Sequence, residues 1–219
     1  MIRLVGDVHG RIDDFVNLVQ NCNYSIQVGD MGFNYDGLAK LDESRHRFIG
    51  GNHDNYDVYY DQPHALGDYG RYHIDNFECF YIRGAFSIDA KQRIKQEEIY
   101  GVKSWWREEQ LGINMMANAL RNYRLTMPNI MITHTCPREV AEIIGNPGAL
   151  KAYGFKPDTF TTHTQELLQE CFDFYRPKYW IYGHFHQNRT DVINGTKFIC
   201  LDELGFIDFT EQGEIVDYI

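Results

Sequence analysis

The sequence lacks the cysteine pattern of a disulfide-stabilised or zinc-binding scaffold. Its five cysteines are scattered through 219 residues and include no Cys-x-x-Cys pair. Disulfide frameworks and structural zinc sites depend on paired, closely spaced cysteines. We therefore expect reduced thiols and a cytoplasmic protein. Cys136 is interpreted as a buried thiol, because no base stands beside it to activate it.

Long apolar stretches are also missing. No run approaches the roughly 20 residues that a membrane-spanning helix needs. The opening MIRLVGDVHG has the pattern of a strand rather than of a signal peptide. The sequence contains no repeat, low-complexity tract, charged tail or recognisable linker. These absences predict one domain over residues 1–219 that does not contact a membrane.

Basic residues are scarce relative to acidic ones. The chain has 21 Lys and Arg against 31 Asp and Glu, a formal net charge of −10. Such a surface repels polyanions, so we expect no long nucleic acid as a partner and disfavour a DNA-repair type nuclease. Divalent cations can offset carboxylates gathered in one site. The charge favours a small substrate, while the oligomeric state stays open.

Short apolar runs recur along the chain, each followed by Gly or a polar cluster. Runs of this kind are typical of buried strands that end in functional loops. Strands are expected over residues 2–5, 25–28, 47–49, 79–82, 129–133, 179–182, 197–201, 205–209 and 214–219. Helices are expected over 11–21, over 104–123 with Ser104 as N-cap, and over 161–175. The alternation predicts a layered α/β protein, and the Gly- and Pro-rich residues 146–158 predict a loop near the site.

Five expected strands run directly into side chains that can bind a metal ion. The blocks are GDVHG at 6–10, GDMG at 29–32, GGNHD at 50–54, His134 after 129–133, and GHFH at 183–186. In an extended backbone, residues at i and i+2 project to the same side, so each such pair can reach one ion. Mixed Asp, Asn and His ligands suit Mn, Fe or Zn rather than calcium. One Asp-x-His motif is commonly just solvated, but five clusters behind apolar runs are hard to obtain by accident.

The ordered blocks over residues 6–186 resemble the signature of the calcineurin-like metallophosphoesterases. That resemblance implies two mixed β-sheets packed as a sandwich flanked by helices, with the site at the carboxyl ends of strands. It also implies two divalent ions, with manganese favoured and iron, zinc or nickel as alternatives. Asp7, His9 and His186 would hold the first ion, Asn52, His134 and His184 the second, and Asp30 would bridge them.

The same resemblance implies the chemistry. A hydroxide bridging the two ions would hydrolyse a small phosphomonoester or phosphodiester. His53 resembles the family's general acid, whose ordinary pKa suits proton donation to the leaving group. Asp54 either orients His53 or supports its loop.

The sequence departs from the protein serine/threonine phosphatases. Their GDxxDRG motif supplies an Asp and an Arg that residues 29–35, GDMGFNY, lack. A protein phosphatase stays an alternative, and a non-catalytic scaffold is a weaker one because every ligand position is filled. Arg83 or Arg93, in a block similar to one found in some microbial members, could face the substrate, although solvated surface positions are favoured. Trp105 and Trp106 are expected to pack in the core at a helix start.

Overall fold

The apolar runs of the sequence form the central strands of two β-sheets. The computed structural model describes residues 1–218. The first sheet has the order β11-β10-β1-β2-β3, with β1 to β3 parallel and β10 and β11 antiparallel to their neighbours. Its strands are β1 (Ile2–Val5), β2 (Tyr24–Gln27), β3 (His46–Phe48), β10 (Phe206–Phe209) and β11 (Ile215–Tyr218).

The second sheet has the order β4-β5-β6-β7-β9-β8. Its central strands are parallel, and the two edge strands pair antiparallel. The strands are β4 (Tyr69–Ile74), β5 (Phe77–Ile82), β6 (Ile130–Thr133), β7 (Tyr179–Tyr182), β8 (Arg189–Ile193) and β9 (Thr196–Cys200).

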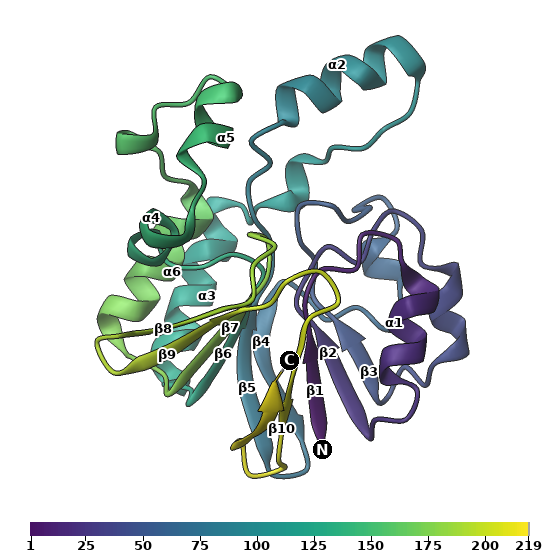
Figure 1. Ribbon diagram of the computed structural model, residues 1–219, viewed down its shortest axis with the longest axis vertical. Coiled ribbons are helices and arrows are strands. Elements are labelled where there is room, and N and C mark those ends of the chain that lie inside the picture. The colour runs from purple at the N-terminus through teal and green to yellow at the C-terminus, as the bar shows by residue number, and fades with distance from the viewer. Residues whose placement is uncertain (219) are drawn as a thin grey trace.

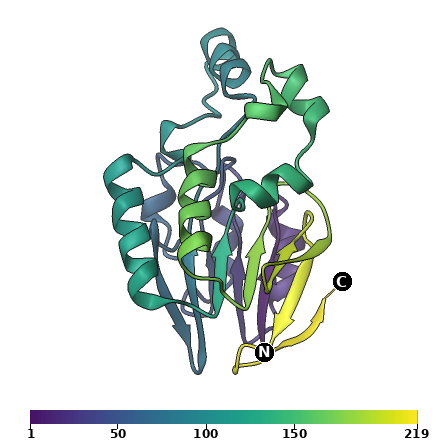
Figure 2. The ribbon, with the colours of Figure 1, turned by 90° about the vertical axis from the view of Figure 1, so that its left-hand side faces the viewer.

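The two sheets pack face to face around a shared apolar core. Leu4 and Ile26 of the first sheet lie in one buried cluster with Ile132 and Ile181 of the second. Helices cover both outer faces (Figures 1 and 2). The predicted sandwich of two mixed sheets flanked by helices is confirmed.

Each outer face has its own set of helices. The first sheet carries α1 (Ile12–Val19) and the short 3-10 helices η1 (Asp36–Lys40) and η2 (Tyr59–Asp61). The second sheet carries α3 (Ile113–Thr126), α4 (Arg138–Ile144) and α6 (His163–Phe174). Thr162 caps α6, since its side chain accepts from the backbone of Gln165 while the Gln165 side chain accepts from the backbone of Thr162.

Two further helices stand above the carboxyl ends of the strands, at the top of Figure 1. They are α2 (Ala90–Tyr100) and α5 (Pro147–Ala152), accompanied by the 3-10 helices η3 (Arg107–Glu109) and η4 (Pro157–Thr159). The expected loop over 146–158 is therefore partly helical. Asn146 begins α5 by accepting hydrogen bonds from the backbone of Gly148 and Ala149.

The helix expected from Ser104 is wrong in its start. Residues 107–109 form only η3, and α3 begins at Ile113. The reason is tertiary, because the backbone carbonyl of Glu109 accepts from Ala85 and its carboxylate accepts from Ser87. Of the Trp pair expected in the core, Trp106 is buried there, although it precedes a 3-10 turn, whereas Trp105 is only partly buried. Within residues 1–218, no helix is both long and apolar enough to cross a membrane.

Candidate metal centre

The expected metal ligands all follow the carboxyl ends of strands. Parallel strands of both sheets point the same way, so the loops that leave them gather at one edge of the sandwich. Asp7 and His9 follow β1, Asp30 follows β2, Asn52 and His53 follow β3, His134 follows β6, and His184 and His186 follow β7. The structure thus brings together side chains that are up to 179 positions apart in the sequence (186 − 7).

Asp7, His9 and His186 form what we call the outer group. Asp7 Oδ2 lies 3.0 Å from His186 Nε2 and 3.6 Å from His9 Nε2. The two histidine nitrogens are 3.0 Å apart. Both rings are partly open to solvent, with 24% of the His9 side chain and 42% of the His186 side chain exposed. Three ligand atoms so close together can share one ion.

Asp30, Asn52 and His134 form the inner group, which is buried. His134 Nδ1 donates to the backbone carbonyl of Val28, so Nε2 of the neutral ring keeps its lone pair for a ligand. That Nε2 lies 3.1 Å from Asp30 Oδ1 and 3.1 Å from Asn52 Oδ1. The inner group therefore presents an imidazole nitrogen, a carboxylate and an amide oxygen to one point.

Asp30 lies between the two groups. Its Oδ1 faces His134 of the inner group, while its Oδ2 is 3.8 Å from His9 Nε2 of the outer group. Asp7 also approaches the inner group, with Oδ1 4.0 Å from His134 Nδ1. The two groups are thus adjacent, and both Asp30 and Asp7 lie within 4.0 Å of histidines from each.

His184 and His186 separate rather than point to the same side. The ring of His184 lies 5.1 Å from the ring of His134, whereas His186 belongs to the outer group. The expectation that an extended backbone would bring both to one ion is wrong for this pair. Both residues have the left-handed conformation, with φ of 68° and 49°, so the chain turns between them. The backbone N–H of His184 instead donates to Asp7.

Backbone strain concentrates at this edge of the sandwich. Left-handed φ is costly for residues with a Cβ and persists at sites where surrounding contacts enforce it. His9 and Asp30 share this conformation with His184 and His186. Gly29, with φ of 110°, shows why the glycine is needed, since a Cβ there would lie 2.4 Å from His134 Nδ1.

The charges in the site depend on one another. Burial alone would raise the pKa of Asp7, but neighbouring histidines, His134 first, outweigh it and hold that pKa below its usual value. The same balance lowers the pKa of Asp30. For His134, burial would lower the pKa, but Asp30 and Asp7 raise it to about 9. Burial and His134 lower the pKa of His184 to about 3, which keeps its ring neutral and able to bind a cation.

The donor set fits divalent cations. Asp7 and Asp30 are fully buried carboxylates, and within residues 1–218 their ion-pair partners are histidines, never lysine or arginine. Two buried negative charges without a permanent cation are costly unless something positive is bound between them. The carboxylates here draw protons onto His134, which is the compensation that a metal ion would supply.

His53 and Asp54 occupy different positions around this centre. The ring of His53 is 5.1 Å from the ring of His9, and burial lowers its pKa. Its backbone N–H donates to Asp30 Oδ1 at 2.6 Å. The carboxylate of Asp54 accepts from the backbone of Asp30, Gly32 and Gly51 and from the Tyr35 hydroxyl. None of its hydrogen bonds within the described chain goes to His53, so its contacts are those of loop support.

A buried hydrogen-bond network behind Asn52 could not be recognised from the sequence. Ser87 Oγ accepts from Asn52 Nδ2 at 3.2 Å and from Arg93 Nη1 at 2.8 Å, and it donates to Glu109 Oε2 at 2.7 Å. Arg93 Nη1 also donates to the backbone carbonyl of Asn52. Ser87 thereby holds the amide of Asn52 with its oxygen toward His134. Ser87 lies in the block singled out for its arginines, but no sequence signal points to Glu109.

The favoured surface placement of the two arginines is wrong. Arg83 is 2% exposed and pairs with Asp68 at 2.7 Å, with its guanidinium 4.6 Å from the Tyr56 ring. Arg93 is 5% exposed and bonds to the network described above. Carboxylate, hydroxyl and carbonyl oxygens accept from the Arg83 guanidinium, and Arg93 Nη1 donates to Ser87 and to the Asn52 carbonyl, whereas Arg93 Nη2 has no hydrogen-bond partner within the described chain. Cys136 is buried, as expected, and burial raises its pKa well above the usual value.

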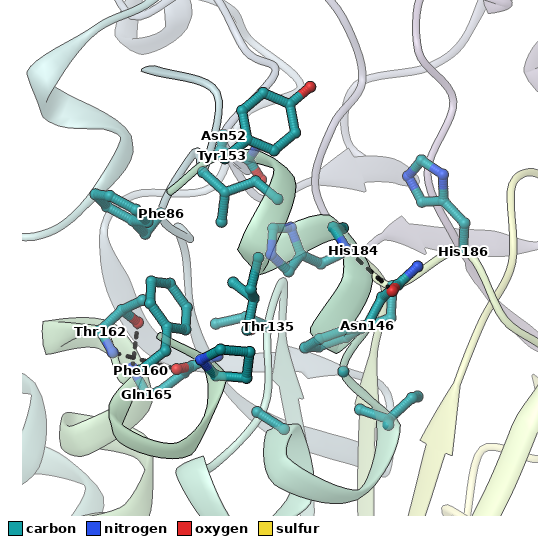
Figure 3. A pocket seen from close by; sticks show the side chains of 18 of the residues that line it. Asn52, Phe86, Thr135, Asn146, Tyr153, Phe160, Thr162, Gln165, His184 and His186 are labelled. Carbon is teal, nitrogen blue, oxygen red and sulfur yellow. Dashed lines mark hydrogen bonds between the residues drawn. The ribbon is translucent and has the colours of Figure 1, made fainter. Parts of the chain in front are cut away.

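A cavity of about 400 Å³ opens from the candidate metal centre (Figure 3). One end is lined by Asp30, Asn52, His53, His184 and His186. The other end is lined by residues 135–165, the segment between β6 and α6, together with Phe86 and Ile88. A volume of this size lies in the range of about 300–1,000 Å³ typical of small-molecule sites.

Comparisons with known proteins agree with this picture. The calcineurin-like phosphoesterase family matches residues 1–188, and no curated protein matches the chain. Phosphopantetheinyl hydrolase from Mycobacterium tuberculosis shares the fold, with a TM-score of 0.52 and 13% identity over 92% of this chain and 89% of that one.

Two other solved structures are more distant. An archaeal phosphodiesterase has a TM-score of 0.43 and 14% identity, covering 100% of this chain and 99% of that chain. Vps29 from Entamoeba histolytica has a TM-score of 0.39 and 14% identity, with 96% and 86% covered. Their scores are too low to add to the argument, which rests on the family match over most of the chain. This protein belongs to the calcineurin-like phosphoesterase family and is a metal-dependent phosphoester hydrolase.

Proposed function

We propose that the protein hydrolyses a small phosphomonoester or phosphodiester with two divalent ions. Asp7, His9 and His186 hold one ion, Asn52, His134 and His184 hold the other, and Asp30 binds both. Manganese is the ion we favour, with iron, zinc or nickel as alternatives. The observation that carries the proposal is the placement of Asp30, whose two carboxylate oxygens face the outer and the inner group at 3.8 and 3.1 Å.

Ions bound there would lower the pKa of a water nucleophile and offset charge on the phosphoryl oxygens. Other residues of the protein orient the ligand side chains for this chemistry. Val28 orients His134, and Ser87 orients Asn52. The backbone N–H of His184 fixes the carboxylate of Asp7. Asp54 holds together the two loops that carry Asp30 and Asn52, which keeps these two ligands of the inner group in place.

We assign His53 as the group that donates a proton to the leaving oxygen. Its ring lines the cavity beside Asp30 and Asn52, while its backbone rather than its ring bonds to Asp30. The ring is thus left available for a substrate atom. A single compact domain and a reducing compartment also form part of the proposal, supported by the shared core of the two sheets and by five buried, unpaired cysteines.

The test is turnover of p-nitrophenyl phosphate and bis(p-nitrophenyl) phosphate by chelated protein, to which Mn, Fe, Zn, Ni and Mg are returned singly. Hydrolysis should disappear on chelation and return with one or more transition ions. The ratio of the two rates assigns monoester or diester preference. Single-stranded DNA, assayed in parallel at physiological salt, should be degraded far more slowly because of the net charge of −10. No turnover by protein shown to contain two ions would overturn the proposal.

A further inference from the structure

The cavity beside the metal centre has a wall of apolar side chains. Phe86, Leu150 and Phe160 line it and are only partly buried, as is Phe185 next to His184. Partly exposed apolar groups that converge on one hollow lose surface to water when a ligand fills it. The end of the cavity away from the ions is therefore suited to an apolar group.

Contacts within the protein hold this wall in position. The ring of Phe160 lies 4.8 Å from Phe155 and 6.1 Å from Phe86, which ties the segment between β6 and α6 to the loop after β5. Asn146 caps α5, and the capping box of Thr162 fixes the start of α6 on the far side. Side chains held by such contacts lose little freedom when a ligand binds, which lowers the entropy cost of binding.

One buried hydroxyl in the wall of the cavity has no partner within the described chain. Thr135 follows His134, is 1% exposed and lines the cavity, and its Oγ1 makes no hydrogen bond within the described chain. A buried hydroxyl without a partner is costly, so a ligand that supplies a donor or acceptor there gains a hydrogen bond. Thr135 lies between His184 and Phe160 in Figure 3.

The charges around the cavity exclude an anionic group. Arg138 is the cationic side chain among the described lining residues, and it is paired with Glu142 at 3.1 Å and with Glu166 at 3.3 Å. Asp89 lines the cavity as well, and its carboxylate lies 3.9 Å from Arg93 Nη1. A carboxylate or second phosphate in the apolar end would lose its hydration without gaining a free cation.

We propose that this cavity binds the organic part of the substrate: a neutral, largely apolar group of aromatic size that offers one hydrogen bond to Thr135. The inference rests on the proposed function, since it places the phosphate at the metal centre. It goes further by naming the alcohol of the phosphoester as uncharged and bulky, which excludes nucleotide polyphosphates and acidic phosphopeptides.

The test measures binding separately from catalysis. Four phosphonates, which cannot be hydrolysed, are titrated calorimetrically into manganese-loaded protein: ethyl, 2-phenylethyl, 2-(benzoylamino)ethyl and 2-carboxyethyl. The 2-phenylethyl compound should bind about 10- to 100-fold more tightly than the ethyl compound, the scale for burying one phenyl ring. The 2-carboxyethyl compound should bind no more tightly than the ethyl compound. Equal affinity for the first two, or tightest binding of the anionic one, would overturn the inference.

Three variants locate the effect. Leu150→Asn replaces an apolar lining side chain by a polar one with the same number of heavy atoms, and Tyr153→Ser removes a lining ring that is 43% exposed. Each should reduce the phenylethyl-to-ethyl affinity ratio by about threefold or more. Ile143→Asn is the matched control, because Ile143 is 50% exposed on α4 and outside the cavity lining. It should keep the wild-type ratio; an unchanged ratio in both lining variants contradicts the assignment.

Thr135→Val tests the hydrogen bond with an isosteric side chain. It should weaken the 2-(benzoylamino)ethyl compound about 2- to 10-fold and leave the 2-phenylethyl compound within twofold, the scale of one neutral hydrogen bond. Hydrolysis of the p-nitrophenyl esters is assayed on the same preparations. Turnover with equal phosphonate affinities would overturn the inference and leave the proposed function standing. A retained phenylethyl-to-ethyl affinity ratio without turnover would support the inference and overturn the proposed function.

Discussion

The outer and inner groups of the metal centre use similar ligands but are held in different ways. The outer group has histidines that are 24% and 42% exposed, and His186 Nδ1 is 3.3 Å from Glu203, itself a surface residue. In the inner group, His134 is 0% and Asn52 is 5% exposed, and each is oriented by a buried partner. Because buried partners cannot be replaced by water, we expect the inner ion to bind more tightly and exchange more slowly.

The largest effect should come from Asp30→Ala, which removes the carboxylate that both groups share. We expect loss of both ions and a fall in kcat/KM of more than about 10⁴-fold, the scale of losing a two-ion clamp. Metal analysis should approach two ions per chain in the wild type and fall well below that in the variant. Added manganese should raise the melting temperature of the wild type more than that of the variant. Asp36→Ala, at an exposed aspartate, is the control. An Asp30→Ala protein that keeps both ions and its activity would show that Asp30 does not bridge the two groups.

His53→Asn should separate proton donation from both groups of ligands. We expect both ions to remain while kcat falls about 10²- to 10³-fold on alkyl phosphoesters, within the range of general acids. A p-nitrophenolate leaving group needs little protonation, so the p-nitrophenyl substrate should be largely spared. The measurement is the ratio of kcat for the two substrate types, with metal content followed in parallel.

The control for this substitution is His73→Asn, at an exposed histidine whose charged neighbour is Glu78. An equal loss on both substrates would assign His53 to substrate positioning instead. Loss of an ion would make His53 a ligand.

Ser87→Ala should weaken the inner ion alone. It frees the amide of Asn52 to rotate, and we expect about 10- to 100-fold lower affinity for one of two ions, as for other residues that orient a ligand. Stepwise metal titration distinguishes the two ions. Ser44→Ala, at an exposed serine whose hydroxyl donates to Asp42, serves as control. Weakening of both ions to the same extent would show that the two groups do not act separately.

Glu203→Gln should have the smallest effect. Glu203 is the outer counterpart of Ser87, but water can replace its contact with His186 because both side chains are about 40% exposed. We expect no more than about a two- to fivefold loss of affinity for the outer ion, in line with surface ion pairs. Glu214→Gln, which disrupts the exposed pair with Lys178, is the control. If the affinity for the outer ion fell as much as the affinity for the inner ion falls in Ser87→Ala, burial of the orienting residue would not explain how tightly each ion is held.

Much of the fold could be predicted because buried parallel strands must be almost wholly apolar. β1 and β7 match their expected bounds, and the other central strands differ by one or two residues. The edge strands β4 and β8 were missed, since edges face solvent and carry polar residues such as Arg71 and Asp191. Helix α2 was missed for a related reason: Arg93 is its only buried residue among those described, so no apolar stripe marks it.

The sequence by itself determined which residues can form the site, because ligand chemistry is a property of Asp, Asn and His side chains placed after apolar runs. Tertiary structure decided where each ligand lies in the metal centre. The turn between His184 and His186 places one ring beside His134 and the other in the outer group, whereas spacing in an extended backbone would allow both rings to reach one ion. It also decided that Ser87 and Glu109 support Asn52, since hydrogen bonds between residues 22 to 35 positions apart leave no local pattern. Local chemistry is encoded residue by residue, whereas orientation is set by contacts that exist only after the sheets have packed.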